Sequence, residues 1–156
     1  MPLTIIVDDI ANFSRPIEAV VNLCHPTPGE VGTGVDAAIH KKAGEKLRAR
    51  LKELGRLKVG GIHYTDGYGL TNAHGDKVQS IFHVLGPLWH KGKMGEEEQL
   101  RRCYLDILQM ACKKAVKGGD ALSQMEVEDL VRQMDEKGVT PTCPHGRPLV
   151  ISITHT

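Results

Sequence analysis

Strand-like and helix-like segments alternate along this chain, and that alternation is the feature that most constrains its fold. Short runs rich in β-branched residues predict strands at 3–10, 17–24, 59–65, 77–86 and 149–154. Amphipathic patterns predict helices at 35–54, 95–119 and 123–138. The order ββαββααβ predicts an α/β fold, with one mixed sheet of about five strands and helices on both of its faces.

Local signals mark where these helices begin and end. Gly55 is placed to end the first helix, because glycine readily adopts the backbone conformation that closes a helix. The acidic residues 96–98 favour the positive N-terminal end of the second helix. Ser123 and Glu126 form a capping-box pattern at the start of the third.

The overall composition limits the classes of protein that the chain resembles. A chain of 156 residues predicts a single domain over 1–156. It carries 20 basic and 19 acidic residues, for a net charge of +1. This balance gives no overall positive charge of the kind that attracts nucleic acid. DNA is therefore not an expected partner, and any nucleic-acid binding needs a local basic patch.

The cysteines and the apolar runs bear on the cellular compartment. The four cysteines are Cys24, Cys103, Cys112 and Cys143, and none forms a Cys-x-x-Cys pair. The first residues, 1–13, lack the basic region of a signal peptide. No apolar run approaches the ~18 residues of a membrane span. These features predict a reduced, cytoplasmic protein with no membrane partner.

A glycine-rich loop, "PGEVGTGVDAAIH" at 28–40, leads into the first helix. Backbone N–H groups and the helix dipole make such a loop suitable for binding an anion, and glycines let the backbone approach a phosphate closely. The alternative interpretation is a helix cap, in which Thr33 is the N-cap and Asp36 completes a capping box. The loop alone does not decide between the two.

Several motifs, taken together, resemble the macrodomain family over residues 4–111. They are "DDI", "AVVN", "GTGVDAAIHKKAG", "TDGYGL", "IFHVLGP" and "EEEQLRRCYLDILQMA", in the family's order and spacing. Macrodomains recognise ADP-ribose, and some members cleave it from proteins or small molecules. The resemblance implies a macrodomain-like fold, a ligand that is ADP-ribose or a related adenine nucleotide, ADP-ribosylated protein as a further partner, and no required cofactor.

The resemblance also implies ligand-binding residues. Asp9 corresponds to the acid that accepts a hydrogen bond from the adenine amino group, and Ile10 is expected to pack beside the base. Asn22 corresponds to the first asparagine of the family's Val-Asn-Ala-Ala-Asn element. The loop that wraps the diphosphate and the distal ribose corresponds to Gly32, Thr33, Gly34 and Val35.

The catalytic positions depart from the family pattern. Asp36 corresponds to the acid that positions water in hydrolytic members, but His25 stands where a second asparagine is expected. Glu30 interrupts the usual glycine run and brings negative charge to a phosphate-binding loop. No Ser-Thr-Gly loop follows residue 111. With Asp36 and His25 as the candidate catalytic residues, we expect at most weak de-ADP-ribosylating hydrolysis.

The last part of the chain, 111–154, resembles the C-terminal end of the MutL mismatch-repair family. The motifs are "ACKKAVK", "LSQMEVEDLV" and "CPHGRP", which suggests a chimera with its junction near residue 111. The resemblance implies a zinc site at Cys112, Cys143 and His145, since zinc accepts sulfur and nitrogen ligands. Alternatively, Cys112 is a small core residue and the turn is a surface connector.

The sequence therefore leaves three functions open. The first is macrodomain-like binding of ADP-ribose. The second is a MutL-like metal-binding element related to a mismatch-repair endonuclease, although the family's Asp-Gln-His-Ala-x-x-Glu element is missing. The third is a folded scaffold with neither activity.

Overall fold

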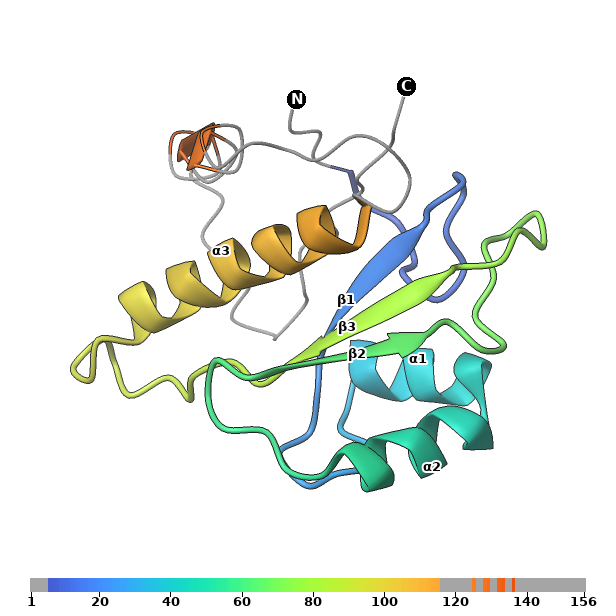
Figure 1. The fold of residues 1–156 in the computed structure, drawn as a ribbon, viewed down its shortest axis with the longest axis horizontal. Coiled ribbons are helices and arrows are strands. Elements are labelled where there is room, and N and C mark those ends of the chain that lie inside the picture. Colours follow the sequence, from blue (N-terminus) through green and yellow to red (C-terminus); the bar gives the residue numbers. More distant parts are fainter. Residues whose placement is uncertain (1–5, 116–124, 126–127, 130–131, 134–135, 137–156) are drawn as a thin grey trace. The chain divides into compact units, whose positions relative to one another are not determined.

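The computed structural model describes residues 6–115 together with 125, 128–129, 132–133 and 136, and of residues 112–115 only the backbone. These residues form parts of two compact units, Ile6–Leu85 and a second that begins at Gly86. The elements (Figure 1) are β1 (Ala19–Leu23), α1 (Val35–Ala43), α2 (Glu45–Leu54), β2 (Ile62–Asp66), β3 (Ser80–Val84) and α3 (Glu96–Ala115). No described helix is both long and apolar enough to cross a membrane.

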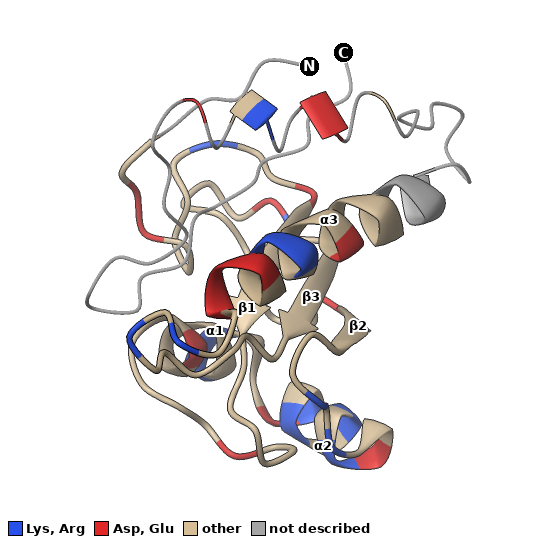
Figure 2. Ribbon diagram, turned by 90° about the vertical axis from the view of Figure 1, so that its left-hand side faces the viewer, with Lys and Arg blue, Asp and Glu red and all other residues tan. Residues whose placement is uncertain are grey.

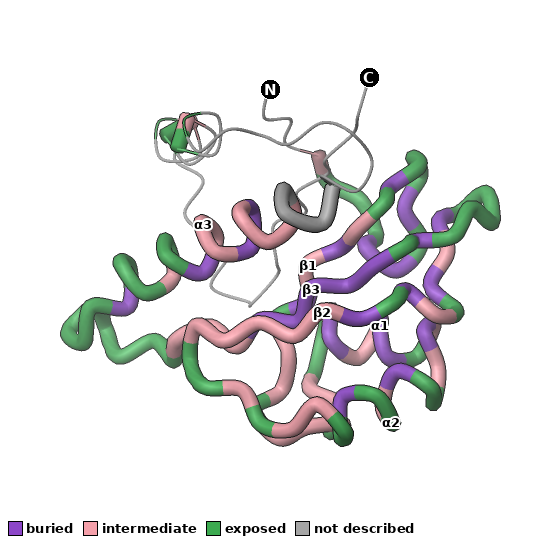
Figure 3. The backbone as a smooth tube through the Cα atoms, in the orientation of Figure 1, coloured by how far each residue is buried: buried purple, intermediate pink, exposed green. Residues whose placement is uncertain are grey.

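The unit Ile6–Leu85 is built on a mixed sheet with the strand order β1-β3-β2. β3 pairs in parallel with β1 and antiparallel with β2. Every residue of β3 is buried, as expected of the central strand (Figure 3). The parallel register places Asn22 of β1 beside His83 of β3. This pairing brings two polar side chains together inside the sheet.

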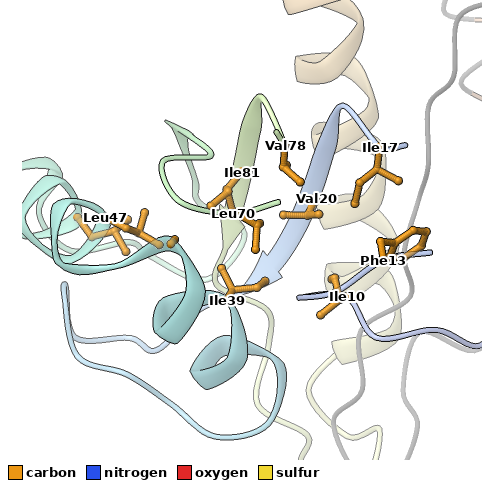
Figure 4. Packing of buried hydrophobic residues seen from close by; sticks show 11 residues of the cluster. Ile10, Phe13, Ile17, Val20, Ile39, Leu47, Leu70, Val78 and Ile81 are labelled. Carbon is orange, nitrogen blue, oxygen red and sulfur yellow. The ribbon is translucent and has the colours of Figure 1, made fainter. Parts of the chain in front are cut away.

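The hydrophobic core of this unit lies between the sheet and its two helices. α1 packs against β1 and α2 packs against β2 (Figures 1 and 4). Ile39 of α1, Leu47 of α2 and Ile81 of β3 are fully buried in one cluster. On the alternate positions of the strands, Tyr64 and Phe82 meet edge to face, with ring centroids 5.2 Å apart. Alternation along the strands thus separates an aliphatic face from an aromatic one.

The single helix expected over 35–54 is in fact two helices, and this expectation was wrong. The chain breaks at Gly44, which has φ of 87° and ψ of −172°. Its N–H donates to the carbonyl of His40, which closes α1 before α2 begins. The side-chain pattern continues across the break, so periodicity alone did not reveal it. Gly55 ends α2, as predicted.

The first expected strand, at 3–10, is not a strand in its described part. Residues 6–9 are irregular and Ile10 lies in a turn. The two aspartates explain this, because their carboxylates bond to the backbone that follows. Asp9 Oδ1 accepts the N–H of Ala11 at 2.9 Å, and Asp8 Oδ2 accepts the N–H of Ser14 at 3.0 Å. Such local bonds turn a chain that its β-branched residues alone would extend.

The other described elements agree with the expected pattern. The strands expected at 17–24, 59–65 and 77–86 correspond to β1, β2 and β3, and the helix expected at 95–119 corresponds to α3. Its acidic first turn is seen in Figure 2. Those residues of 123–138 that are described are helical, and Arg132 pairs there with Asp129 and with Glu136. The strand expected at 149–154 lies outside the described residues.

Candidate functional site

A buried hydrogen-bond network joins the end of β1 to the first turn of α1. The Asn22 side chain is fully buried, and Asp36 is only 4% exposed. Asn22 Nδ2 donates to Asp36 Oδ1 at 2.6 Å, and the N–H of Gly32 donates to Asp36 Oδ2 at 2.6 Å. His40, one turn further along α1, places Nε2 3.4 Å from Asp36 Oδ1. One carboxylate therefore holds the strand, the glycine loop and the helix in place.

The surroundings of Asp36 keep it ionised. Burial alone would raise the pKa of this carboxyl, but hydrogen bonds from His40, Asn22 and the Gly32 N–H outweigh that effect and hold the pKa below its usual value. A buried carboxylate with several donors is stable as an anion. Asp36 is thus suited to accept hydrogen bonds rather than to donate a proton.

The network continues from Asn22 into the sheet through His83. Asn22 Nδ2 lies 3.2 Å from His83 Nδ1, and His83 Nε2 lies 3.0 Å from Thr65 Oγ1. Because the Asn22 amide group donates, Nδ1 must accept, and the ring proton of a neutral His83 then sits on Nε2. Thr65 accepts this proton and its hydroxyl donates to the carbonyl of Asp66 at 3.1 Å. Asn22, His83 and Thr65 thus each donate to the next group, and the chain of hydrogen bonds ends at the carbonyl of Asp66.

His83 is neutral in this arrangement. Burial, and after it the nearby His40, lower the pKa of His83 to about 3, against the opposing effect of Asp36. A protonated ring would place a donor at Nδ1 against the donating amide of Asn22. The neutral state of the His83 ring therefore helps to keep the Asn22 amide directed at Asp36.

The alternative interpretation of the loop, a helix cap formed by Thr33 and Asp36, was wrong. α1 begins at Val35 with Gly34 as its N-cap residue, and no side chain caps it. Gly34 has φ of 60°, and Thr33 is exposed. Asp36 bonds instead to Asn22 and to the glycine loop. A hydrogen bond to the buried Asn22 amide is stronger than one at the solvent-exposed end of the helix, because the effective dielectric constant is lower inside the protein.

The glycine loop at 32–35 presents backbone N–H groups to solvent. Within the described chain, the N–H groups of Thr33, Gly34 and Val35 donate to no acceptor, whereas that of Gly32 is bonded to Asp36. A helix start leaves such donors unsatisfied and carries a partial positive charge. The loop is consequently suited chemically to an anion such as a phosphate group.

His25 and Glu30 lie together on the segment that precedes this loop. The N–H of Thr27 donates to His25 Nδ1 at 3.1 Å, and the same nitrogen lies 3.6 Å from Glu30 Oε2. The His25 side chain is 34% exposed. Glu30 is thereby placed beside the ring of His25.

A small pocket of about 290 Å³, open to solvent, lies against the same segment. Residues 24–30 line one part of it, and Leu51 of α2 and His63 of β2 line others. His40 also lines it, and His40 Nδ1 is a buried atom with no partner among the described residues; Asn22 Oδ1 is another such atom. Ordered water commonly satisfies atoms of this kind.

Asp9 and Ile10, the residues expected at the adenine, differ in their surroundings. Asp9 is exposed on its turn, whereas Ile10 is only 6% exposed and belongs to the hydrophobic core. Lys42 of α1 anchors the turn, since its Nζ donates to the carbonyls of Ala11 and Thr71, each at 2.6 Å. α1 therefore positions the Asp9 turn as well as Asp36.

The predicted metal ligands lie beyond what the structure describes. Cys143 and His145 are outside the described residues, and the side chain of Cys112 is as well. Among the residues that are described, no group of three or more His, Cys, Asp or Glu side chains is arranged to hold a metal ion.

Sequence reasoning missed part of the network. His83, within the motif "IFHVLGP", is fully buried, and its bonds to Asn22 and Thr65 were not foreseen. The available signal was the occurrence of polar residues within strands that are otherwise apolar. Asp36 and His40, four residues apart on one helix, gave a second signal of a shared face.

The comparisons with known proteins agree with this geometry. A model of the Macro domain family matches residues 22–139. The chain belongs to the macro domain family. It is 39% identical over 98 residues to a macro domain-containing protein of Chlorobaculum tepidum, covering 63% of this chain and 53% of that protein. It is 39% identical over 95 residues to one of Mesorhizobium japonicum, covering 61% and 50%.

Solved macrodomain structures share its fold. The Oceanobacillus iheyensis macrodomain with ADP superimposes with a TM-score of 0.55 at 28% identity, covering 67% of this chain and 56% of that one. The Trypanosoma brucei macrodomain in complex with ADP-ribose gives 0.51 at 31% identity, covering 62% and 37%. The chain spans about half the length of the curated relatives it matches. The predicted macrodomain fold, a mixed sheet with helices, is confirmed.

The MutL resemblance receives no support from these comparisons. The Macro domain match extends to residue 139, well past the junction placed near 111. The helical pattern of the described residues in 123–138 therefore belongs to the matched macro domain region.

The neutral state of His83 predicts a specific acid sensitivity. In the unfolded chain His83 protonates near pH 6.5, whereas in the folded protein it stays neutral down to about pH 3. The free energy of unfolding should therefore be highest above pH 6.5 and fall between pH 6.5 and 3, by at most about 1.4 kcal/mol per pH unit. The contribution of Asp36, whose folded pKa is lowered, is lost only at lower pH, below its unfolded value of 3.8.

Denaturant unfolding at pH 7, 6, 5 and 4 checks this expectation. The His83→Asn variant should lose the part of the slope that His83 causes, while the remaining histidines contribute to both proteins. Should that variant not fold, ¹⁵N NMR of the histidine rings of the unmodified protein gives the same information. A His83 ring that titrates near pH 6.5, or carries its proton on Nδ1, would contradict the network.

Proposed function

We propose that this chain binds ADP-ribose or a related adenine nucleotide, with the diphosphate held at the glycine loop 32–35. The observation that carries the proposal is the loop itself. Asp36 takes up the N–H of Gly32 and fixes the loop, which leaves the N–H groups of Thr33, Gly34 and Val35 available to phosphate oxygens. Family membership supports the proposal, as do the solved Oceanobacillus macrodomain with ADP and the Trypanosoma macrodomain in complex with ADP-ribose.

In this proposal the adenine is recognised by Asp9. Its Oδ1 is engaged with the N–H of Ala11, and its exposed carboxylate retains acceptor capacity for an exocyclic amine. Ile10 contributes by packing into the core beneath the turn, because it is too buried to cover a base in this conformation. Asn22, equally buried, acts on the ligand through Asp36.

Adenine recognition should depend on the charge of Asp9. A hydrogen bond to a charged acceptor is worth roughly 1.5–3 kcal/mol, so Asp9→Ala should weaken ADP-ribose binding at least about tenfold in calorimetry. Asp9→Asn separates adenine recognition from the part that Asp9 plays in the structure of its turn. The amide oxygen still accepts the Ala11 N–H, whereas the amide N–H₂ faces the adenine amine. Asp9→Asn should therefore bind as weakly as Asp9→Ala but unfold like the unmodified protein.

Asp66→Ala, at the exposed end of β2, serves as the matched control and should bind normally. Unchanged affinity in both Asp9 variants would remove adenine recognition from the proposal but leave phosphate binding at the loop standing.

Hydrolysis of ADP-ribosyl linkages should be weak. The cleavage passes through an oxocarbenium-like state and requires a positioned water with a stabilising carboxylate. Asp36 has the charge for this role, but its two oxygens are bonded to Asn22 and Gly32. His25, at the position of the expected amide, has Nδ1 bonded to Thr27. We expect little release of ADP-ribose from a mono-ADP-ribosylated protein, and turnover that Asp36→Asn abolishes would show that these bonds rearrange during catalysis.

The proposal also covers the partner, the cellular location and the need for a metal. We expect an ADP-ribosylated protein as the physiological partner and a reduced, cytoplasmic location. In this proposal the binding needs no metal, because backbone N–H groups of the glycine loop meet the phosphates. Zinc at Cys112, Cys143 and His145 stays a prediction, which elemental analysis of the purified chain decides.

A further inference from the structure

A second surface of unusual composition lies in the unit that begins at Gly86, on the loop that leads into α3. Three large apolar side chains are exposed there: Leu88 at 76%, Trp89 at 59% and Met94 at 66%. His90, Lys91 and Lys93 lie between Trp89 and Met94 and are also exposed. We call residues 88–94 the tryptophan loop.

The tryptophan loop is held in one conformation by Glu96. This side chain is 2% exposed, and its carboxylate accepts the N–H of His90 at 2.5 Å and the N–H of Met94 at 2.7 Å. Lys91 and Gly92 both have positive φ, at 60° and 73°. A carboxylate that clamps both ends of a turn reduces the number of conformations it can adopt. The exposed side chains are therefore presented by a fixed backbone.

Trp89 lies near the turn at Gly92. A Cβ atom placed on Gly92 would lie 3.6 Å from Cη2 and 3.9 Å from Cζ2 of the indole, which is ordinary van der Waals distance. Trp89 is 59% exposed, so much of its surface stays in contact with solvent. An aromatic ring with exposed surface is the usual platform on which a nucleobase stacks.

We propose that the tryptophan loop binds single-stranded nucleic acid, with a base stacked on Trp89 and the phosphate backbone drawn to Lys91 and Lys93. Neither lysine is paired with a carboxylate within the described chain. This is the local basic patch that a chain of net charge +1 requires. The inference goes beyond the proposed function, since no residue of the ADP-ribose site belongs to this loop.

The observations favour nucleic acid over a lipid surface. Insertion into a bilayer interface would require Trp89 to project together with Leu88 and Met94, whereas its indole lies beside Gly92. Two lysines separated by one glycine match successive phosphates of a flexible strand. Glu97 and Glu98, exposed on the first turn of α3, oppose extension of the contact along the helix and limit the site to a few nucleotides.

Trp89 is the only tryptophan of the chain, so its fluorescence reports on this site alone. Titration with a thymidine oligonucleotide of about twelve nucleotides should quench the emission, with a Kd on the order of 10–100 μM at low salt. Two neutralised phosphates predict a slope of log K against log salt of about −1.4. ADP-ribose at concentrations that saturate the glycine loop should leave the quenching by the oligonucleotide unchanged.

The variants are compared by polarisation of a labelled oligonucleotide. Trp89→Leu should weaken binding at least about fivefold, and Trp89→Phe should restore most of it, because a base stacks on either ring. Lys91→Glu with Lys93→Glu should abolish binding and flatten the salt slope. The matched double reversal Lys46→Glu with Lys58→Glu, on exposed residues of the other unit, should change it little.

Three outcomes would overturn the proposal. One is the absence of quenching at about 1 mM oligonucleotide. The second is binding that Trp89→Leu leaves intact and that inorganic polyphosphate matches, which would reduce the site to simple charge attraction. The third is a blue shift of the emission with phosphatidylserine vesicles but no response to the oligonucleotide, which would make the loop a lipid-binding surface.

Discussion

The hydrogen bond from the Asn22 amide to the Asp36 carboxylate is the interaction on which the rest of the site depends. It joins a strand end to a helix start, and both side chains are buried. An ionised carboxylate in such surroundings is stable only with donors on its oxygens, and Asn22, His40 and the Gly32 N–H provide them. Removing one donor would leave a buried charge short of partners. The conformation of the glycine loop therefore follows from the electrostatics of Asp36.

This dependence reaches into the sheet through His83. The parallel pairing of β1 with β3 places His83 beside Asn22, and Thr65 of β2 accepts from the far side of the ring. A shift of register by one residue would turn His83 to the opposite face and leave the Asn22 amide without its second acceptor. The sheet thus positions the loop by a chain of directed hydrogen bonds, and Ile39 and Ile81 belong to the hydrophobic cluster of the same unit.

Much of the fold was predictable from the sequence, because strands and helices leave periodic patterns. β1, β2, β3 and α3 were predicted with small errors at their ends. The break at Gly44 was not, since the apolar stripe continues across it, and the turn at Asp8 and Asp9 was mistaken for a strand because side-chain bonds overrode β-propensity. In the site, motif resemblance pointed to Asp36 and Asn22, whose roles toward a ligand stay predictions. It could not show that Asn22 faces inward or that His83 and Thr65 complete its bonds, since these contacts join residues far apart in the sequence.

The central claim is that the loop fixed by Asp36 is where ADP-ribose binds, and amide NMR tests it most directly. In a ¹⁵N-labelled sample, addition of ADP-ribose should shift the amide signals of Thr33 and Gly34 in a saturable way, because their N–H groups meet the diphosphate. The amides of Gly75 and Gly92, which lie on other loops, should not move. Saturable binding that leaves Thr33 and Gly34 unshifted, or the absence of any shift at millimolar ADP-ribose, would contradict the account.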